Sequence, residues 1–220
     1  MAKTTFLMAA LVCATALATS PALGQDWSGT YYGGSLGFGS GNYLQGVEAL
    51  DEVGQSVDVN GLVYGAHIGF AAQAGWLVYG ADAGISTGPS GATGTLVPDA
   101  NWICESGDCY VNIDYIGTLR GRVGVVTDIR TVVYGAAGLA IAGVDGGIQG
   151  SAQAGTSTAS GLTYSLGVER ITSPFSTVFA EIGYYDLGTL TLGVDNSDPL
   201  EDFTAEGDFL TVTAGINFKF

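Results

Sequence analysis

The stretch Asn-Ile-Asp-Tyr-Ile-Gly-Thr-Leu-Arg-Gly-Arg-Val-Gly-Val, residues 112–125, decides the fold. Side chains of opposite character alternate along it. The polar face carries Asn112, Asp114, Thr118, Arg120 and Arg122, and the apolar face carries Ile113, Tyr115, Leu119, Val123 and Val125. A period of two is typical of a β-strand with one polar and one apolar face. A soluble β-sandwich has the same alternation, so other features must separate the two folds.

The alternation recurs along the chain between turn residues, and it predicts eight strands. We expect them near residues 28–38, 60–71, 76–86, 111–126, 131–144, 161–170, 176–188 and 208–220. The predicted connections alternate in length. Those near residues 39–59, 87–110, 145–160 and 189–207 are long, and the other three are short turns. Short turns at one end and long loops at the other are typical of outer-membrane barrels.

Two further features favour a membrane barrel over a sandwich. The polar faces are rich in small residues, as a narrow lumen requires; these include Gly33, Ser35, Gly37, Gly65, Gly69, Gly80 and Gly84. Aromatic residues near strand ends are candidates for the girdles at the membrane interfaces: Trp27, Tyr31, Trp76, Tyr110, Tyr184, Tyr185, Phe218 and Phe220. The predicted fold is therefore all-β: an eight-stranded antiparallel transmembrane β-barrel with up-and-down topology.

The N-terminal segment predicts export. Lys3 precedes an apolar run at residues 6–18, and the small residues Ala22 and Gly24 lie three and one positions before a cut after Gly24, which is typical of a cleaved signal peptide. We expect residues 1–24 to be the signal peptide and residues 25–220 to be the barrel domain in the cell outer membrane. Beyond this segment, no run approaches the roughly 20 apolar residues of a spanning helix.

The charge of the chain limits its partners. Without Lys3, five basic and 21 acidic residues remain, a net charge of −16. Nucleic acid is therefore not an expected partner. Many of the carboxylates fall in the long connections, where two interpretations stay open: solvation of exposed loops, or binding of divalent cations near anionic lipid headgroups.

Four stretches together resemble the small porin-like outer-membrane surface antigens, which are OmpA-like, opacity-type barrels. They are residues 26–34 (DWSGTYYGG), 116–140 (IGTLRGRVGVV through VYGAAGLA), 184–188 (YYDLG) and 212–220 (VTAGINFKF). The resemblance covers essentially the whole predicted mature chain. It implies an eight-stranded barrel with both termini in the periplasm, and it transfers nothing to the long loops.

The C-terminal strand carries a second implication of this resemblance. In such barrels a terminal aromatic residue, preceded by alternating apolar residues, is recognised by the barrel-assembly machinery. Ile216, Phe218 and Phe220 match that pattern. The same side chains would also face lipid. Expected partners are thus periplasmic chaperones, the assembly machinery, and outer-membrane lipid and lipopolysaccharide. A surface ligand is not identified.

The polar faces place charged side chains in the predicted lumen, where buried charges must be paired. They are His67, Asp82, Asp114, Arg120, Arg122, Glu169 and Glu181. Counted from the short turns, His67, Asp82, Arg120 and Glu181 lie at similar heights. We expect a network in which Arg120 pairs with Glu181 or Asp82. An eight-stranded barrel is nearly filled by its own side chains, which favours a plug; a gated pore is the alternative.

The sequence indicates no catalytic residue, cofactor or metal site. A lipid A-modifying enzyme would need a nucleophile and a base facing lipid, whereas the only histidine, His67, is predicted inside the barrel. Cys104 and Cys109 are expected to pair after export. Because no C-terminal domain follows the eighth strand, peptidoglycan tethering is not expected. The predicted role is envelope integrity and surface interaction, as a surface antigen or an adhesin-like protein, with passive diffusion of small solutes as the alternative.

Overall fold

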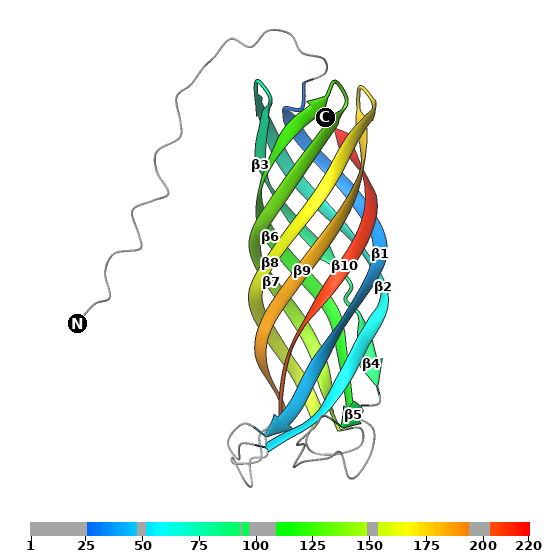
Figure 1. Ribbon diagram of the computed structural model, residues 1–220, viewed down its shortest axis with the longest axis vertical. Coiled ribbons are helices and arrows are strands. Elements are labelled where there is room, and N and C mark those ends of the chain that lie inside the picture. The colour runs from blue at the N-terminus through cyan, green and yellow to red at the C-terminus, as the bar shows by residue number, and fades with distance from the viewer. Residues whose placement is uncertain (1–25, 48–51, 93, 97–108, 149–153, 194–202) are drawn as a thin grey trace, which may run out of the picture.

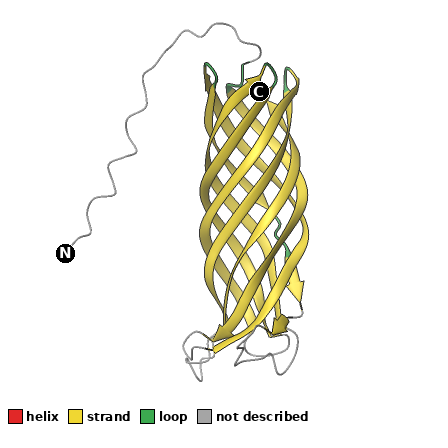
Figure 2. Cartoon of the chain, viewed as in Figure 1, coloured by secondary structure: helices red, strands yellow, loops and turns green. Residues whose placement is uncertain are grey.

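The structure is a computed structural model that describes residues 26–47, 52–92, 94–96, 109–148, 154–193 and 203–220. These residues form strands and turns, and none of them belongs to a helix long and apolar enough to cross a membrane. The strands are tilted relative to one common axis and wind around it as a tall barrel (Figures 1 and 2). Their bounds are β1 Gly29–Val47, β2 Glu52–Ala74, β3 Leu77–Ser86, β4 Ser90–Ala92, β5 Gly94–Leu96, β6 Cys109–Asp128, β7 Thr131–Ile148, β8 Ala154–Ser173, β9 Ser176–Gly193 and β10 Phe203–Lys219.

The strands close into a ring of eight antiparallel positions, as the sequence predicts. β1 pairs with β2 on one side and with β10 on the other, so that Tyr31 lies opposite both Gly69 and Lys219. β3, β4 and β5 together occupy a single position beside β2. β3 and β4 also pair with β6. Residues 87–89 interrupt this third strand, but the backbone N–H of Thr87 still donates to the carbonyl of Tyr64 at 2.9 Å.

The two ends of the barrel differ. Three tight turns, at residues 74–77, 128–131 and 173–176, lie at the end where the chain also finishes, which we call the turn end (Figure 1). The strand ends that the four longer connections join lie at the opposite end, which we call the loop end. The expected asymmetry of the connections is confirmed. The strands nevertheless run further toward the loop end than predicted: residues 39–47 and 52–59, for example, were expected in a loop and belong to β1 and β2.

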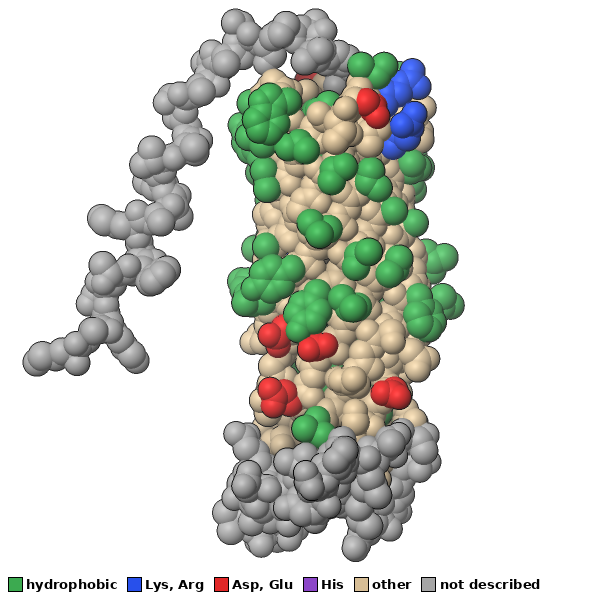
Figure 3. Space-filling model, in the orientation of Figure 1, with side chains coloured by type: hydrophobic (Ala, Val, Ile, Leu, Met, Phe, Trp, Pro, Cys, Tyr) green, Lys and Arg blue, Asp and Glu red, His purple; other side chains and the backbone are tan. Residues whose placement is uncertain are grey.

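The strand extensions were missed because the side-chain pattern inverts along each strand. Over the part nearer the turn end, large apolar side chains point outward and form a belt (Figure 3). In β2, for instance, Leu62, Tyr64 and Ile68 are each more than half exposed. Toward the loop end of the same strand, Val57 and Val59 are buried inside, and Asp58 and Asn60 point outward. The loop end therefore has the pattern of a soluble barrel, with polar residues outside.

The belt is bounded by aromatic side chains, although not all of those predicted. Trp76, Phe218 and Phe220 are exposed at the turn end, and Tyr184 lies at the loop-end edge of the belt. Trp27 and Tyr31, also predicted for the girdle, point inward and are 3% and 4% exposed. Tyr185 stacks inside on Phe209, with ring centroids 4.8 Å apart. A bulky ring on an inward position packs in the lumen, so position near a strand end does not by itself identify a girdle residue.

Candidate functional site in the barrel lumen

Arg120 lies on the inward face of β6 between two carboxylates. Its Nε donates to Asp82 Oδ1 at 2.9 Å, and its Nη1 donates to Glu181 Oε1 at 2.6 Å. Asp82 is the direct cross-strand neighbour of Arg120 on β3, whereas Glu181 belongs to β9 and is reached across the lumen. Nη1 also donates to Ser165 Oγ at 3.3 Å. Arg120 thus pairs with both of the carboxylates that the sequence offered as its partners.

Arg122, two residues further along β6, makes a second ion pair. Its Nη2 donates to Glu169 Oε2 at 2.6 Å, and the guanidinium lies 4.0 Å from the ring centroid of Tyr134. Its Nη1 donates to the Tyr31 hydroxyl at 3.3 Å. The other Glu169 oxygen, Oε1, accepts hydrogen bonds from Asn217 Nδ2 and Thr177 Oγ1. Both charges are therefore hydrogen-bonded in several directions, as buried charges must be.

The two ion pairs belong to one network. The Tyr134 hydroxyl donates to Glu181 Oε2 at 2.9 Å, which links the Arg122 side to the Arg120 side. His67 Nε2 and Asn217 Oδ1 are 2.6 Å apart, and Asn217 connects His67 to Glu169. His67 thus joins the network from the Glu169 side, through Asn217. We call this set the lumen network: Tyr31, His67, Asp82, Arg120, Arg122, Tyr134, Ser165, Glu169, Thr177, Glu181 and Asn217.

The lumen network draws at least one side chain from each of the eight positions in the ring. Sequence reasoning found its charged members and His67 but missed Tyr31, Tyr134, Ser165, Thr177 and Asn217. Strand alternation could have found them, since each points inward from its strand. The other members are charged or titratable side chains, which sequence reasoning looks for. Tyr31 and Tyr134 bury their rings and present only a hydroxyl to the network.

Asp114 does not belong to the lumen, contrary to the prediction. The pairing of β6 with β7 shifts between Ile113 and Tyr115, which marks a β-bulge. The bulge leaves Asp114 and Tyr115 both exposed, and it returns Ile116 to the interior. One extra residue reverses the alternation beyond it. The period of two in residues 112–125 therefore holds from Ile116 to Val125 but fails at Asp114.

Two glycines make room for the aromatic members of the network. A Cβ built on Gly69 would lie 2.5 Å from the Tyr31 hydroxyl oxygen, and one on Gly167 would lie 2.5 Å from the ring of Tyr134. Any larger residue would displace these rings, which flank the Arg122 guanidinium. The predicted reason for small residues on the polar face is confirmed at these positions.

Apolar side chains fill the interior on the loop side of the lumen network. We call them the outer apolar layer: Tyr43, Val57, Val59, Cys109, Val111, Ile113, Ile116, Ala140, Ala142, Val144, Ile148, Ala159, Leu187, Leu190, Leu192, Phe203, Ala205 and Phe209. Tyr43, Val59 and Phe209 are among those with no exposed surface. The sequence prediction contained no such layer, because its residues were assigned to loops or to an apolar outer face.

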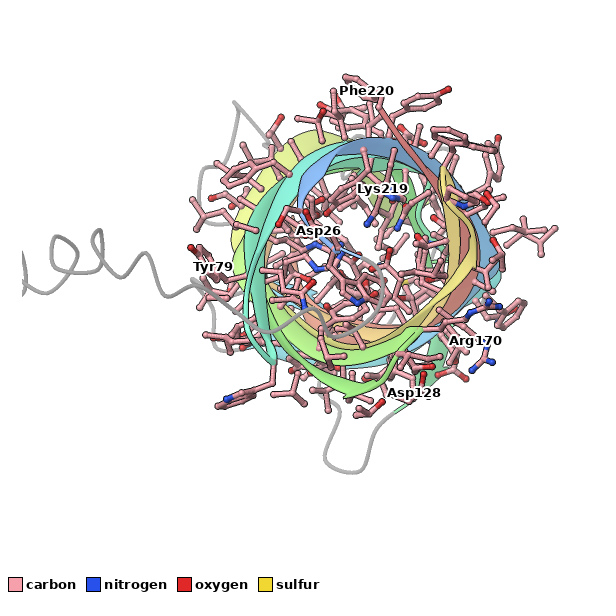
Figure 4. All side chains as sticks on the ribbon, turned by 90° about the horizontal axis from the view of Figure 1, so that it is seen from above. Asp26, Tyr79, Asp128, Arg170, Lys219 and Phe220 are labelled. Atoms are coloured by element: carbon pink, nitrogen blue, oxygen red, sulfur yellow. The ribbon has the colours of Figure 1, made fainter. Side chains whose placement is uncertain are left out.

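A smaller apolar cluster lies on the turn side of the network. Trp27 packs there with Val78, Val132, Tyr134 and Ile171. The Trp27 backbone N–H donates to Gln73 Oε1 at 2.9 Å, and Lys219 Nζ lies 5.1 Å from its ring centroid. Lys219 and Asp26 lie within the ring of strands when it is viewed from the turn end (Figure 4). The backbone N–H of Ser28 donates to the Asp26 carboxylate and lowers the pKa of that group.

A polar cavity of about 70 Å³ adjoins the lumen network. His67, Asp82, Arg120, Glu181 and Asn217 contribute to its lining, with Ser35, Thr118, Thr211 and Thr213 among the others. One water needs roughly 10–15 Å³ of such space, so the cavity has room for a few water molecules. It is polar enough to hold them, and too small for a solute the size of a sugar.

The predicted assembly signal lies on the outside of the barrel. Ile216, Phe218 and Phe220 are 38%, 40% and 73% exposed, and the rings of Phe218 and Phe220 lie 5.7 and 5.9 Å from that of Tyr32. Their recognition by the assembly machinery stays a prediction. Cys109 is buried at the start of β6, while Cys104 lies outside the described residues. The proposed disulfide and the signal peptide also stay predictions. Most of the acidic residues in the long connections lie outside the described residues, so both interpretations of them stay open as well.

Known proteins resemble this chain in sequence and in structure. No protein-family model matches the chain. It is 29% identical over 210 residues to the 31 kDa outer-membrane immunogenic protein of Brucella melitensis, a match that covers 89% of this chain and 84% of that protein. The protein of the same name from Brucella suis gives the same values. The crystal structure of Neisserial surface protein A matches with a TM-score of 0.50 at 16% identity, over 88% of this chain and 98% of that one.

The chain is an eight-stranded outer-membrane β-barrel. The resemblance to the small porin-like surface-antigen barrels is confirmed by an outer-membrane relative along most of the chain and by a shared fold. In such barrels the short turns face the periplasm, so the turn end of this outer-membrane barrel is periplasmic and the loop end is extracellular. The outer apolar layer therefore lies nearer the cell surface, and the lumen network lies nearer the periplasm.

Proposed function

We propose that this outer-membrane barrel is a non-conducting scaffold that presents its extracellular end at the cell surface, with a role in envelope integrity and surface interaction. The observation that carries the proposal is the outer apolar layer. It crosses the interior between the lumen network and the extracellular end, with many side chains fully buried. An ion that left the network toward the outside would lose its water there, and in the described residues little beyond the Tyr43 hydroxyl and the Gln45 side chain could replace that water.

A surface role is supported by the height of the barrel. The strands of the ring that run from end to end contain 17–23 residues, whereas a tilted membrane-spanning strand needs about 9–11. The excess lies at the extracellular end, where the outward residues are polar. A rigid wall thus stands beyond the lipid, and a Brucella relative of this chain is named as an immunogenic protein. We infer that the wall and its loops are surface-exposed, in an antigen or an adhesin-like protein.

A small pore is the second candidate, and the polar cavity favours it. The cavity adjoins Arg120, Asp82 and Glu181, so opposite charges already line a space that holds water. Breaking these ion pairs would widen that space. For conduction, the path would still have to continue through the outer apolar layer on one side and past Trp27 on the other.

Liposome swelling separates the two candidates. Purified protein refolded into liposomes is expected to give no swelling with small sugars, and planar bilayers are expected to show no steps in conductance. Arg120→Ala should leave both results unchanged, because the outer apolar layer remains in place. Swelling by the wild-type protein would overturn the scaffold proposal. Conductance only in Arg120→Ala would instead indicate a gate at that ion pair.

The scaffold proposal includes no enzymatic activity. His67 points into the lumen, where it contacts Asn217 and lies edge-on to the ring of Phe179. A lipid substrate outside the barrel would not reach it. Mass spectrometry of lipid A from cells with and without the protein tests this point, and an altered acyl pattern would contradict it.

A further inference from the structure

In the described part of the chain, the basic side chains outside the lumen network all lie at one end of the barrel. The chain contains six Lys and Arg residues. Apart from Lys3, Arg120 and Arg122 lie in the lumen, and the remaining three lie at the periplasmic end. No basic residue lies on the extracellular side, even in the long connections. The exposed charges there, on the described strands, are all carboxylates: Asp58, Asp114, Asp186, Glu206 and Asp208. Figure 3 shows the basic side chains of one face gathered at the opposite end.

Arg130 and Arg170 are the exposed pair at the periplasmic end. Arg130 lies in the turn between β6 and β7, and Arg170 lies on β8, directly opposite Thr131 of β7. Arg170 Nη1 donates to Thr131 Oγ1 at 3.1 Å, which holds the guanidinium against the neighbouring strand. The two arginines are therefore one residue apart across adjacent strands, and both are exposed.

Both arginines lie where the lipid belt ends. On β8 the outward positions are apolar from Leu162 to Val168, and Arg170 is the next outward residue. On β7 the outward Val133 is likewise followed by Thr131. Figure 4 shows Arg170 outside the ring, on the side that meets the membrane. This height corresponds to the headgroups of the periplasmic leaflet.

Neither guanidinium has an ion-pair partner in the described part of the chain. The ion pairs found there, within 4.0 Å, belong to Arg120 and Arg122. Asp128 is the neighbouring carboxylate, but its Oδ1 accepts the backbone N–H of Arg130 at 2.7 Å and so closes the turn. Two cationic groups with unused donors thus face the headgroup layer beside an apolar wall.

We propose that Arg130 and Arg170 form a binding site for the phosphate of an anionic glycerophospholipid in the periplasmic leaflet. Guanidinium groups suit phosphate because their planar N–H donors match its oxygens. The acyl chains of the bound lipid lie along the apolar surface at Val133 and Val168. The site fixes the depth and tilt of this side of the barrel. This inference does not depend on whether the lumen conducts.

Native mass spectrometry tests the site with phosphatidylglycerol and phosphatidylcholine as competing probes. The protein refolded in detergent micelles is expected to retain phosphatidylglycerol preferentially. Arg130→Gln with Arg170→Gln should weaken phosphatidylglycerol binding by about twenty-five-fold, because each basic group near an anionic headgroup contributes a factor of about five. The double lysine variant should keep most of the preference, and Asp128→Asn should strengthen it.

Lys219→Gln is the matched control, since it removes one positive charge from the same end but inside the mouth of the barrel, where Nζ donates to the carbonyl of Asp26. It should leave lipid binding unchanged. A heat-dependent shift in gel mobility verifies that each variant is folded. The proposal is overturned if the double Gln variant keeps the wild-type preference or if Lys219→Gln lowers it equally. Displacement of the lipid by millimolar inorganic phosphate would also overturn it, because the site would then recognise free phosphate.

Discussion

The two halves of the barrel interior are built on opposite principles. The periplasmic half holds two arginines and three carboxylates in one hydrogen-bonded network, and the extracellular half holds an apolar core. The surrounding medium explains the difference. Where lipid covers the outside, apolar residues face outward and polar ones must face inward and pair. Where water covers the outside, the preference reverses, and the same strands continue as a soluble barrel.

The comparison also separates two kinds of stability. The apolar half gains from burial of surface and tolerates no charge. The polar half gains less from each ion pair, because desolvation offsets the attraction, but it loses heavily when one partner is removed. Substitutions in the two halves should therefore differ in kind as well as in size.

The largest effect is expected when a charge enters the apolar half. Val59→Asp would place a carboxylate in the outer apolar layer without a partner, at a cost of more than about 4 kcal/mol. We expect this variant not to refold, which would be seen as loss of the band whose gel mobility shifts on heating. Asn60→Asp is the matched control one residue away, since Asn60 points outward, and it should refold normally. Normal refolding of Val59→Asp would show that this layer admits water.

The next largest effect is expected when the polar half loses its central cation. Arg120→Ala leaves Asp82 and Glu181 unpaired and should lower the free energy of unfolding by about 3–5 kcal/mol. Urea titration of the refolded protein measures this change. The triple variant Arg120→Met, Asp82→Asn, Glu181→Gln should recover most of the loss. If it does not, the cost comes from packing around Arg120 and not from unpaired charge.

A smaller effect tests how His67 is connected. A double-mutant cycle of His67→Ala with Asn217→Ala should give a coupling energy of about 0.5–1.5 kcal/mol, as for one hydrogen bond. The cycle of His67→Ala with Arg120→Ala should give much less, since no direct contact joins these two residues. Equal couplings would contradict this connection, because His67 would then be coupled to Arg120 as strongly as to Asn217.

The smallest effect is expected at the bulge. Asp114→Asn should change the free energy of unfolding by no more than about 0.5 kcal/mol, because the carboxylate is exposed on the outer wall. The same substitution at Asp82, inside the lumen, should cost several times more. Similar costs for Asp82→Asn and Asp114→Asn in urea titration would place Asp114 back among the lumen charges.

The sequence predicted the ring of eight strands, the asymmetry of the connections and the pairing of Arg120, because these depend on a local period of two. The sequence did not predict the parts of the strands beyond the lipid belt. There apolar residues such as Val57 and Val59 face inward and polar residues face outward, and this segment was assigned to a loop. Asp114 was misplaced because a bulge depends on pairing with β7, which local pattern does not reveal. Tyr31, Tyr134 and Asn217 were missed because they carry no charge, although strand alternation turns each of them inward.

The inversion of polarity above the lipid belt has an evolutionary consequence. In the extracellular wall, inward residues such as Val57 and Val59 are constrained by the core, while their outward neighbours Asp58 and Asn60 are exposed. Substitutions can therefore accumulate at every second residue of these strands without disturbing the fold. Sequence drift in this wall should follow the same period of two that revealed the strands, with the variable positions confined to one face.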